Sequence, residues 1–106
     1  MARTLINVPA KARRGEIIEI KVLIQHDMES GFRVGPTGNM IPRSIITDFV
    51  CRYNGEEVFR AVLYPAIAAN PFFAFSTTAT ESGTVTFAWT GDNGFSAAGS
   101  APVTVE

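Results

Sequence analysis

Residues 15–26 carry the most regular hydrophobic pattern in the chain, because apolar and polar side chains alternate along them. One face of the extended strand that this alternation predicts consists of β-branched residues, namely Ile18, Ile20, Val22 and Ile24. The opposite face carries Glu19, Lys21 and Leu23. Four β-branched side chains favour an extended backbone and need an apolar surface to pack against. We therefore expect this strand to lie against the core of a β protein.

The same alternation returns twice in the middle and late parts of the chain. Residues 44–53 place Phe49 and Cys51 on one face, and residues 83–90 place Phe87 and Trp89 on one face. Between these two segments, Asn54-Gly55 is typical of a type I′ turn, which requires positive φ at both central residues. The pattern therefore predicts a hairpin of residues 44–53 and 56–63.

Three further segments complete the predicted strands. Residues 4–8 end at Pro9, a second strand begins at Pro71, and the last covers residues 95–106, with Gly99 indicating a bulge. In the second of these, Phe73 faces one side and Phe72 the other, so one of the two cannot face the core. Two connections are expected to differ from the strands: residues 11–15 (KARRG) should form a tight basic turn, and residues 66–69 (AIAA) a short helical turn.

These segments predict an all-β domain. No stretch keeps a 3.6-residue period, and turn residues recur about every ten positions, as in immunoglobulin-like sandwiches. We expect about seven antiparallel strands in one domain spanning residues 1–106, without a disulfide because Cys51 is the only cysteine. The predicted core consists of Trp89, Phe73, Phe75, Phe87, Ile20 and Val22.

Composition excludes several functional classes. The apolar fraction of 46% is enough for a core without metal or disulfide support. A net charge of −1 argues against a dedicated nucleic-acid binder, and no apolar run is long enough to span a membrane. We expect no cofactor, because no glycine-rich nucleotide-binding motif occurs. By itself, the lack of a signal-peptide pattern at the N-terminus would favour the cytoplasm.

Catalytic chemistry has few candidate residues. A Cys–His pair could be made from Cys51 and His26, or His26 could bind a metal with Asp27, Glu29 and Asp48. No known ligand spacing supports the metal site, and Cys51 lies in a β-rich run, where packing is the simpler role. We therefore expect no catalytic residues and no metal site, and keep a small metal-dependent redox domain using His26 and Cys51 as the alternative.

The loop of residues 27–43 is the best candidate for a binding surface. It is longer than most connections and contains Met28, Glu29, Phe32 and Arg33, and Met, Phe and Arg are enriched at interface centres. The alternative is that Phe32 folds back over an open end of the sandwich. For Phe72 and Phe73 too, one of the two side chains must either cover an end of the sandwich or be available to a partner. The candidate interface residues are therefore Met28, Glu29, Phe32, Arg33, Phe72 and Phe73.

Three motifs, in this order, resemble the Z subunit of the Sox sulfur-oxidation carrier. They are HDMESGFR at residues 26–33, PAIAANP at residues 65–71 and WTGDNG at residues 89–94. The resemblance extends over essentially the whole chain. It implies an immunoglobulin-like sandwich, in agreement with the strand pattern.

The resemblance also implies a function. The Z subunit is not itself a catalyst, and pairs with a Y subunit whose cysteine, near its own C-terminus, carries thiosulfate-derived sulfur. The heterodimer presents this sulfur to other Sox proteins in the bacterial periplasm, and the Z chain is exported with the signal-bearing Y chain. The isolated Z chain is a candidate for self-association. Cys51 does not match the sulfur-carrying position.

Overall fold

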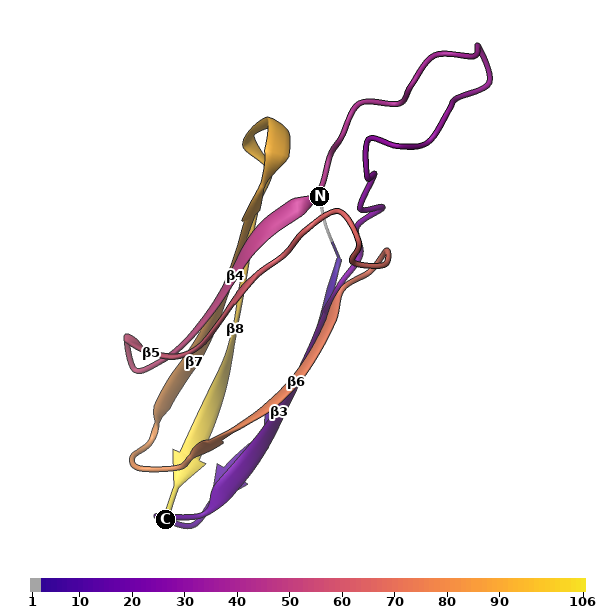
Figure 1. Cartoon of the computed structure of the whole chain (residues 1–106). Coiled ribbons are helices and arrows are strands. Elements are labelled where there is room, and N and C mark those ends of the chain that lie inside the picture. The colour runs from indigo at the N-terminus through magenta and orange to yellow at the C-terminus, as the bar shows by residue number, and fades with distance from the viewer. Residues whose placement is uncertain (1–2) are drawn as a thin grey trace.

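The computed structural model of the chain describes residues 3–106, which form two facing β-sheets (Figure 1). The small sheet has the order β1-β3-β6, and the large sheet has the order β2-β8-β7-β4-β5. The strands of the small sheet are β1 (Thr4–Asn7), β3 (Ile17–Ile24) and β6 (Phe72–Thr78). Those of the large sheet are β2 (Lys11–Ala12), β4 (Ile46–Tyr53), β5 (Glu56–Val62), β7 (Gly83–Gly91) and β8 (Ser96–Val105). The predicted all-β sandwich is confirmed.

The core lies between the sheets and is centred on Phe49 of β4. The Phe49 ring stacks on Phe73 of β6 at 4.6 Å, and Phe59 of β5 stacks on Phe75 at 4.3 Å. Trp89 completes the cluster, with its ring 5.3 Å from that of Phe49. Of the six predicted core residues, four are buried, namely Ile20, Val22, Phe87 and Trp89, whereas Phe73 and Phe75 are partly buried against them.

Four details of the predicted strands are wrong. Residues 11–15 are not only a turn, because β2 forms at their start, giving eight strands in residues 3–106. This strand also pairs parallel with β8, so the sandwich is not wholly antiparallel. Residues 66–69 form no helical turn, since a single reverse turn at Tyr64–Ile67 is followed by a bend at Ala69 and Asn70, where Asn70 has a φ of 54°. The β7–β8 register runs through Gly99 without a bulge.

Glycine is needed at position 99 for packing between the sheets rather than for a bulge. A Cβ atom there would lie 2.6 Å from the Ile6 side chain of β1, so the small residue lets the facing sheets approach.

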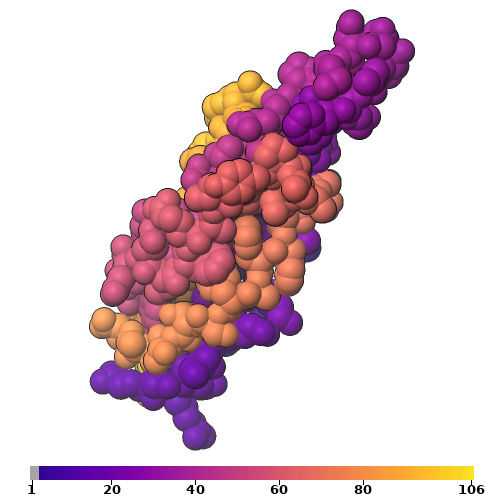
Figure 2. Space-filling model, in the orientation of Figure 1, coloured from indigo at the N-terminus to yellow at the C-terminus, as the bar shows by residue number. Residues whose placement is uncertain are grey.

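The molecule is long and narrow, with extents of 58 × 20 × 19 Å. Much of this length is a projection between β3 and β4, which extends beyond the end of both sheets (Figures 1 and 2). We call residues 29–44 the arm. Within residues 3–106 no helix is long and apolar enough to cross a membrane.

Candidate partner-binding surface

The arm is an extended loop closed by two isolated β-bridges. At its root, Glu29 and Ser44 exchange backbone hydrogen bonds of 2.9 and 2.8 Å. Toward its tip, Val34 pairs with Met40, and a turn joins Gly35 to Asn39. The chain therefore returns along itself, which explains how a long loop without a core of its own keeps a defined path.

Met28 fixes the point where the arm leaves the sandwich. Its side chain is only 5% exposed, and its sulfur accepts the Ile46 N–H of β4 at 3.3 Å. Its φ of 52° is uncommon for a residue other than glycine, and the Met28 N–H donates to Nδ1 of His26 at 2.9 Å. Met28 was a predicted interface residue, but the structure makes it part of the core beneath the arm.

A bidentate ion pair ties the returning limb of the arm to the turn after β7. Arg43 donates two hydrogen bonds of 2.9 Å to Asp92, which also accepts the Ile45 N–H at 3.1 Å. The hydrogen bonds from Arg43, and then from the backbone of Ile45, hold the pKa of the Asp92 carboxyl below its usual value. The same pair raises the pKa of Arg43. The ion pair and its backbone bond thus hold the arm against the large sheet.

Within the arm, Glu29 and Arg33 form a second bidentate pair, with hydrogen bonds of 3.1 and 2.9 Å. The bonds from Arg33 lower the pKa of the Glu29 carboxyl. The Glu29 side chain is 17% exposed and that of Arg33 is 65% exposed. Arg33 is therefore the member of the pair that a partner could contact.

Apolar side chains remain in solvent on the arm and at its end of the sandwich. Phe32 is 78% exposed, so the alternative that it folds back over the sandwich is wrong. Other exposed apolar residues of the arm and of the neighbouring β5–β6 connection are Val34, Met40, Tyr64 and Ile67. Asn70 links that connection to the arm root through a reciprocal pair of hydrogen bonds with His26, of 2.9 and 2.8 Å.

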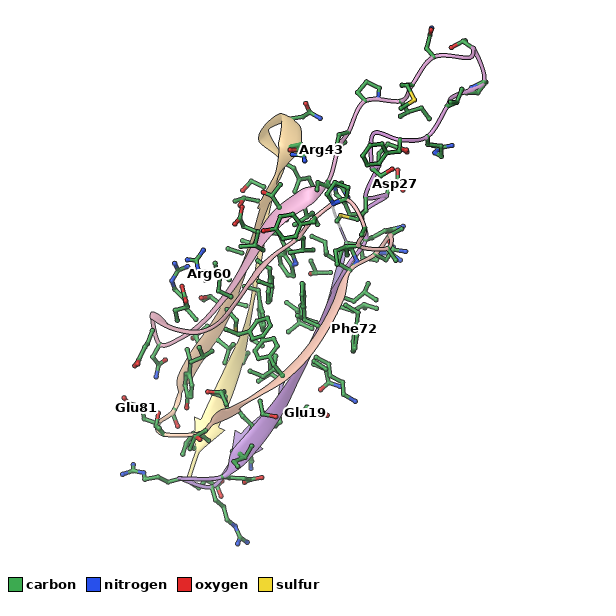
Figure 3. All side chains as sticks on the ribbon, in the orientation of Figure 1. Glu19, Asp27, Arg43, Arg60, Phe72 and Glu81 are labelled. Carbon is green, nitrogen blue, oxygen red and sulfur yellow. The ribbon has the colours of Figure 1, made fainter. Side chains whose placement is uncertain are left out.

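The outer face of the small sheet adds a second apolar patch. Leu5, Leu23 and Phe72 are cross-strand neighbours on β1, β3 and β6, and we call them the apolar row. They line a shallow groove of about 420 Å³ together with Lys21 and Asn7. Leu23 lies one residue before the end of β3, so the row is at the arm end of the sheet. Phe72, labelled in Figure 3, lies on the side of the small sheet that faces away from the large sheet.

The predicted interface residues therefore divide into two groups. Phe32, Arg33 and Phe72 are exposed, whereas Met28 and Phe73 pack into the core and Glu29 supports Arg33. The sequence reasoning missed the Arg43–Asp92 pair, since both residues lie in segments that resemble ordinary turns. It also missed Leu5 and Leu23, although an apolar Leu23 on the polar face of its strand was a visible sign.

The residues considered for redox or metal chemistry are not brought together. Cys51 is fully buried, and burial raises the pKa of its thiol to about 11. Nδ1 of His26 accepts a hydrogen bond from the Met28 N–H, and the His26 ring packs edge-on against Phe95 at 4.8 Å. Within residues 3–106 no three His, Cys, Asp or Glu side chains gather as metal ligands. The structure therefore gives the metal-dependent redox hypothesis no support.

The three motifs that carry the family resemblance meet at the root of the arm. His26 and Met28 come from the first, Asn70 from the second, and Gly91 and Asp92 from the third. A Cβ atom at Gly91 would lie 2.3 Å from the Ile45 carbonyl oxygen, so this position needs glycine for the close approach of β7 to the start of β4.

Solved structures of several proteins share this fold. Superoxide reductase (neelaredoxin) from Ignicoccus hospitalis aligns with a TM-score of 0.75 at 15% identity, covering 97% of this chain and 80% of that one. The sulfur carrier protein SoxY from Chlorobium limicola f thiosulfatophilum aligns with a TM-score of 0.68 at 11% identity, covering 97% and 78%. The CARDB domain from Pyrococcus furiosus gives 0.60 at 16%, covering 100% and 88%. These likenesses show the fold alone.

Sequence comparison gives a more specific result. No curated protein matches the chain. The family model "Sulphur oxidation protein SoxZ" matches residues 6–102, which is nearly the whole domain and includes all three motifs at the arm root. This chain therefore belongs to the SoxZ family of sulfur-oxidation proteins.

Proposed function

We propose that this chain is the non-catalytic subunit of a sulfur carrier and acts by pairing with a SoxY-type subunit. Membership of the SoxZ family is the observation that carries this proposal. In the complex, the SoxY-type subunit holds the sulfur intermediate on its own cysteine during thiosulfate oxidation. This chain supplies a folded platform through which that subunit is recognised.

The state of Cys51 supports a non-catalytic role. A nucleophilic cysteine acts as its thiolate and needs access to the substrate. Cys51 has neither property, since it is fully buried and its pKa of about 11 keeps the thiol protonated at neutral pH. The only thiol of this chain is thus unsuited to carry sulfur.

The exposed apolar side chains support a role in binding. Interface centres are enriched in aromatic residues, Met and Arg. The arm presents Phe32, Met40 and Arg33, and the apolar row adds Phe72 at the same end of the molecule. A stable heterodimer should bury at least roughly 1,200 Å² in total.

The proposal places the complex in the periplasm. The chain would be exported together with the signal-bearing SoxY-type subunit, and through that subunit it would meet the other Sox proteins. Fractionation of the source cells tests this part, since the chain should leave the cytoplasm only when its partner is produced.

The direct test is to mix the purified chain with the SoxY-type subunit from the same source at micromolar concentration. Size-exclusion chromatography with light scattering should show a 1:1 complex, and separate elution would contradict the proposal. A second measurement assigns the roles. After incubation of the complete Sox system with thiosulfate, mass spectrometry should find the added sulfur on the partner and none on this chain.

A further inference from the structure

The edge strands of the two sheets differ in their protection against pairing. Exposed edges are usually blunted by charged residues, by proline or by being very short. In residues 3–106 the edge strands are β1 and β6 in the small sheet and β2 and β5 in the large sheet. The β5 edge carries Glu56, Glu57 and Arg60, whereas β1 and β2 have only four and two residues. The β6 edge, Phe72–Thr78, has seven residues and no charge.

The hydrogen bonds at the two ends of the β3–β6 ladder show which backbone groups of β6 are free. Ile24 N–H donates to Pro71 O at 3.2 Å, and Ala79 N–H donates to Glu16 O at 2.8 Å. In an antiparallel ladder, alternate residues bond to the same neighbour, and the β3–β6 register is continuous. Every second residue from 71 to 79 is therefore bonded to β3. The residues whose N–H and C=O point to the open edge are Phe72, Ala74, Ser76 and Thr78.

The apolar row lies directly beside this free edge. Phe72 is 56% exposed and belongs both to the edge and to the groove that Leu5 and Leu23 line. A strand added to β6 would extend the outer face of the small sheet, and its side chains near Phe72 would cover part of the groove. Addition of a strand combines main-chain hydrogen bonds with side-chain contacts of this kind.

The spacing of the free groups allows a two-fold related arrangement. When two such edges pair antiparallel about Phe75, position 72 of one strand faces position 78 of the other, and position 74 faces position 76. Each of these positions carries free N–H and C=O groups, so both strands satisfy all of them. The SoxY structure from Chlorobium limicola has the same fold over 97% of this chain, so a subunit of that fold provides an equivalent edge strand.

We propose that the uncharged β6 is the strand through which this chain pairs with the SoxY-type subunit, whose corresponding edge strand adds antiparallel to Phe72–Thr78. This inference depends on the proposed function. It specifies that a sheet continuous across the heterodimer, with the apolar row beside the junction, holds the two subunits together.

Proline at position 74 tests the pairing. Ala74→Pro removes an N–H that points to the open edge and leaves the bonds to β3 intact, because Phe73 and Phe75 make them. Val62→Pro is the matched control on β5. Val62 is 55% exposed, and its N–H also points to an open edge, since Leu63 N–H donates to Thr47 O at 2.8 Å. The two variants thus remove the same group from different edges.

We expect Ala74→Pro to weaken binding of the SoxY-type subunit by at least about tenfold, and Val62→Pro to change it by less than about twofold. Circular dichroism of the isolated variants checks their folding. Hydrogen exchange of the unmodified chain tests the same edge without any substitution. On complex formation, the amides of Ala74, Ser76 and Thr78 should exchange at least about tenfold more slowly, whereas that of Val62 should not change.

The outcomes separate this inference from the proposed function. If the heterodimer forms, but Ala74→Pro does not weaken it and the β6 amides exchange as fast in the complex as in the free chain, the proposed function stands and the pairing edge is wrong. If the unmodified chain does not bind the SoxY-type subunit, both fail. If the isolated chain is a dimer that Ala74→Pro makes monomeric, with heterodimer affinity unchanged, the occupant of β6 is a second copy and our inference is overturned.

Discussion

The sandwich core and the arm are stabilised by different interactions. In the core, stacked aromatic rings fill the space between the sheets, and Phe49 at their centre is fully buried. In the arm, hydrogen bonds and two bidentate ion pairs hold the chain path, while Phe32 is 78% exposed. The arm therefore keeps its shape without burying its own apolar side chains.

This difference separates stability from recognition. Burial of apolar area is the main favourable contribution to folding, so the core side chains determine whether the domain folds. An exposed aromatic side chain gains that energy only when a partner covers it, so the apolar residues of the arm remain available for binding. The two sets of residues should respond differently to the same kind of substitution.

The largest expected effect is loss of core packing. Phe49→Ala removes the ring on which Phe73 stacks and should lower the free energy of unfolding by about 3–5 kcal/mol. Urea denaturation followed by tryptophan fluorescence measures this change. The same truncation at exposed Phe32 is the control and should alter stability by less than about 0.5 kcal/mol. Equal destabilisation by both variants would remove the distinction between core and arm.

The arm root should show an intermediate effect. Gly91→Ala places a methyl group 2.3 Å from the Ile45 carbonyl oxygen, so β7 and the start of β4 must move apart. We expect a loss of about 1–3 kcal/mol in urea denaturation. Gly35→Ala, near the arm tip, is the matched control because its Cβ would lie 3.2 Å from the Ile41 side chain, which is only slightly crowded. If Gly91→Ala left the free energy of unfolding unchanged, the close approach of β7 and β4 at the root would not be required.

The exposed arm should matter for binding rather than for folding. Phe32→Ala should weaken binding of the SoxY-type subunit by about 1–2 kcal/mol, which is roughly a five- to thirtyfold increase in Kd. Ile17→Ala provides the control, because Ile17 is 72% exposed but lies at the start of β3, at the other end of the strand from the arm. Titration calorimetry compares the two, and an equal effect would show that the arm is not a specific contact.

The ion pair at the root should give the smallest effect, and it should depend on pH. Because Arg43 and the Ile45 N–H lower the pKa of Asp92, this carboxyl stays ionised in the folded chain at a pH where an unfolded Asp, with a pKa of about 3.9, takes up a proton. Its stabilising contribution is therefore complete above that value and is lost as the pH falls through the lowered pKa.

Asp92→Asn tests this dependence. The variant should be less stable than the unmodified chain near neutral pH, and the difference should shrink in acid. Thermal unfolding from pH 7 to pH 2 measures it. A difference that grows on acidification would contradict the assigned role of the carboxylate, and Glu57→Gln, in the surface pair with Arg60, serves as the control.

Only part of the candidate surface could be predicted from the sequence. Alternation required that one of Phe72 and Phe73 face away from the core, and the structure shows that this residue is Phe72. The position of Phe32 could not be predicted, since a loop residue has no period to assign its face, and Met28 and Phe32 are both apolar loop residues. The difference between them came from Met28 packing beneath β4, a contact between residues 18 positions apart.

The sequence by itself determined the fold class, the hairpin at Asn54-Gly55 and most of the core, because side-chain direction in a strand repeats every two residues. The tertiary structure alone decided which strands lie at the edges, that β6 is the long uncharged one, and that three distant motifs meet at the arm root. Strand order and loop contacts depend on interactions between residues far apart in the chain, and local periodicity contains no information about which distant segments become neighbours.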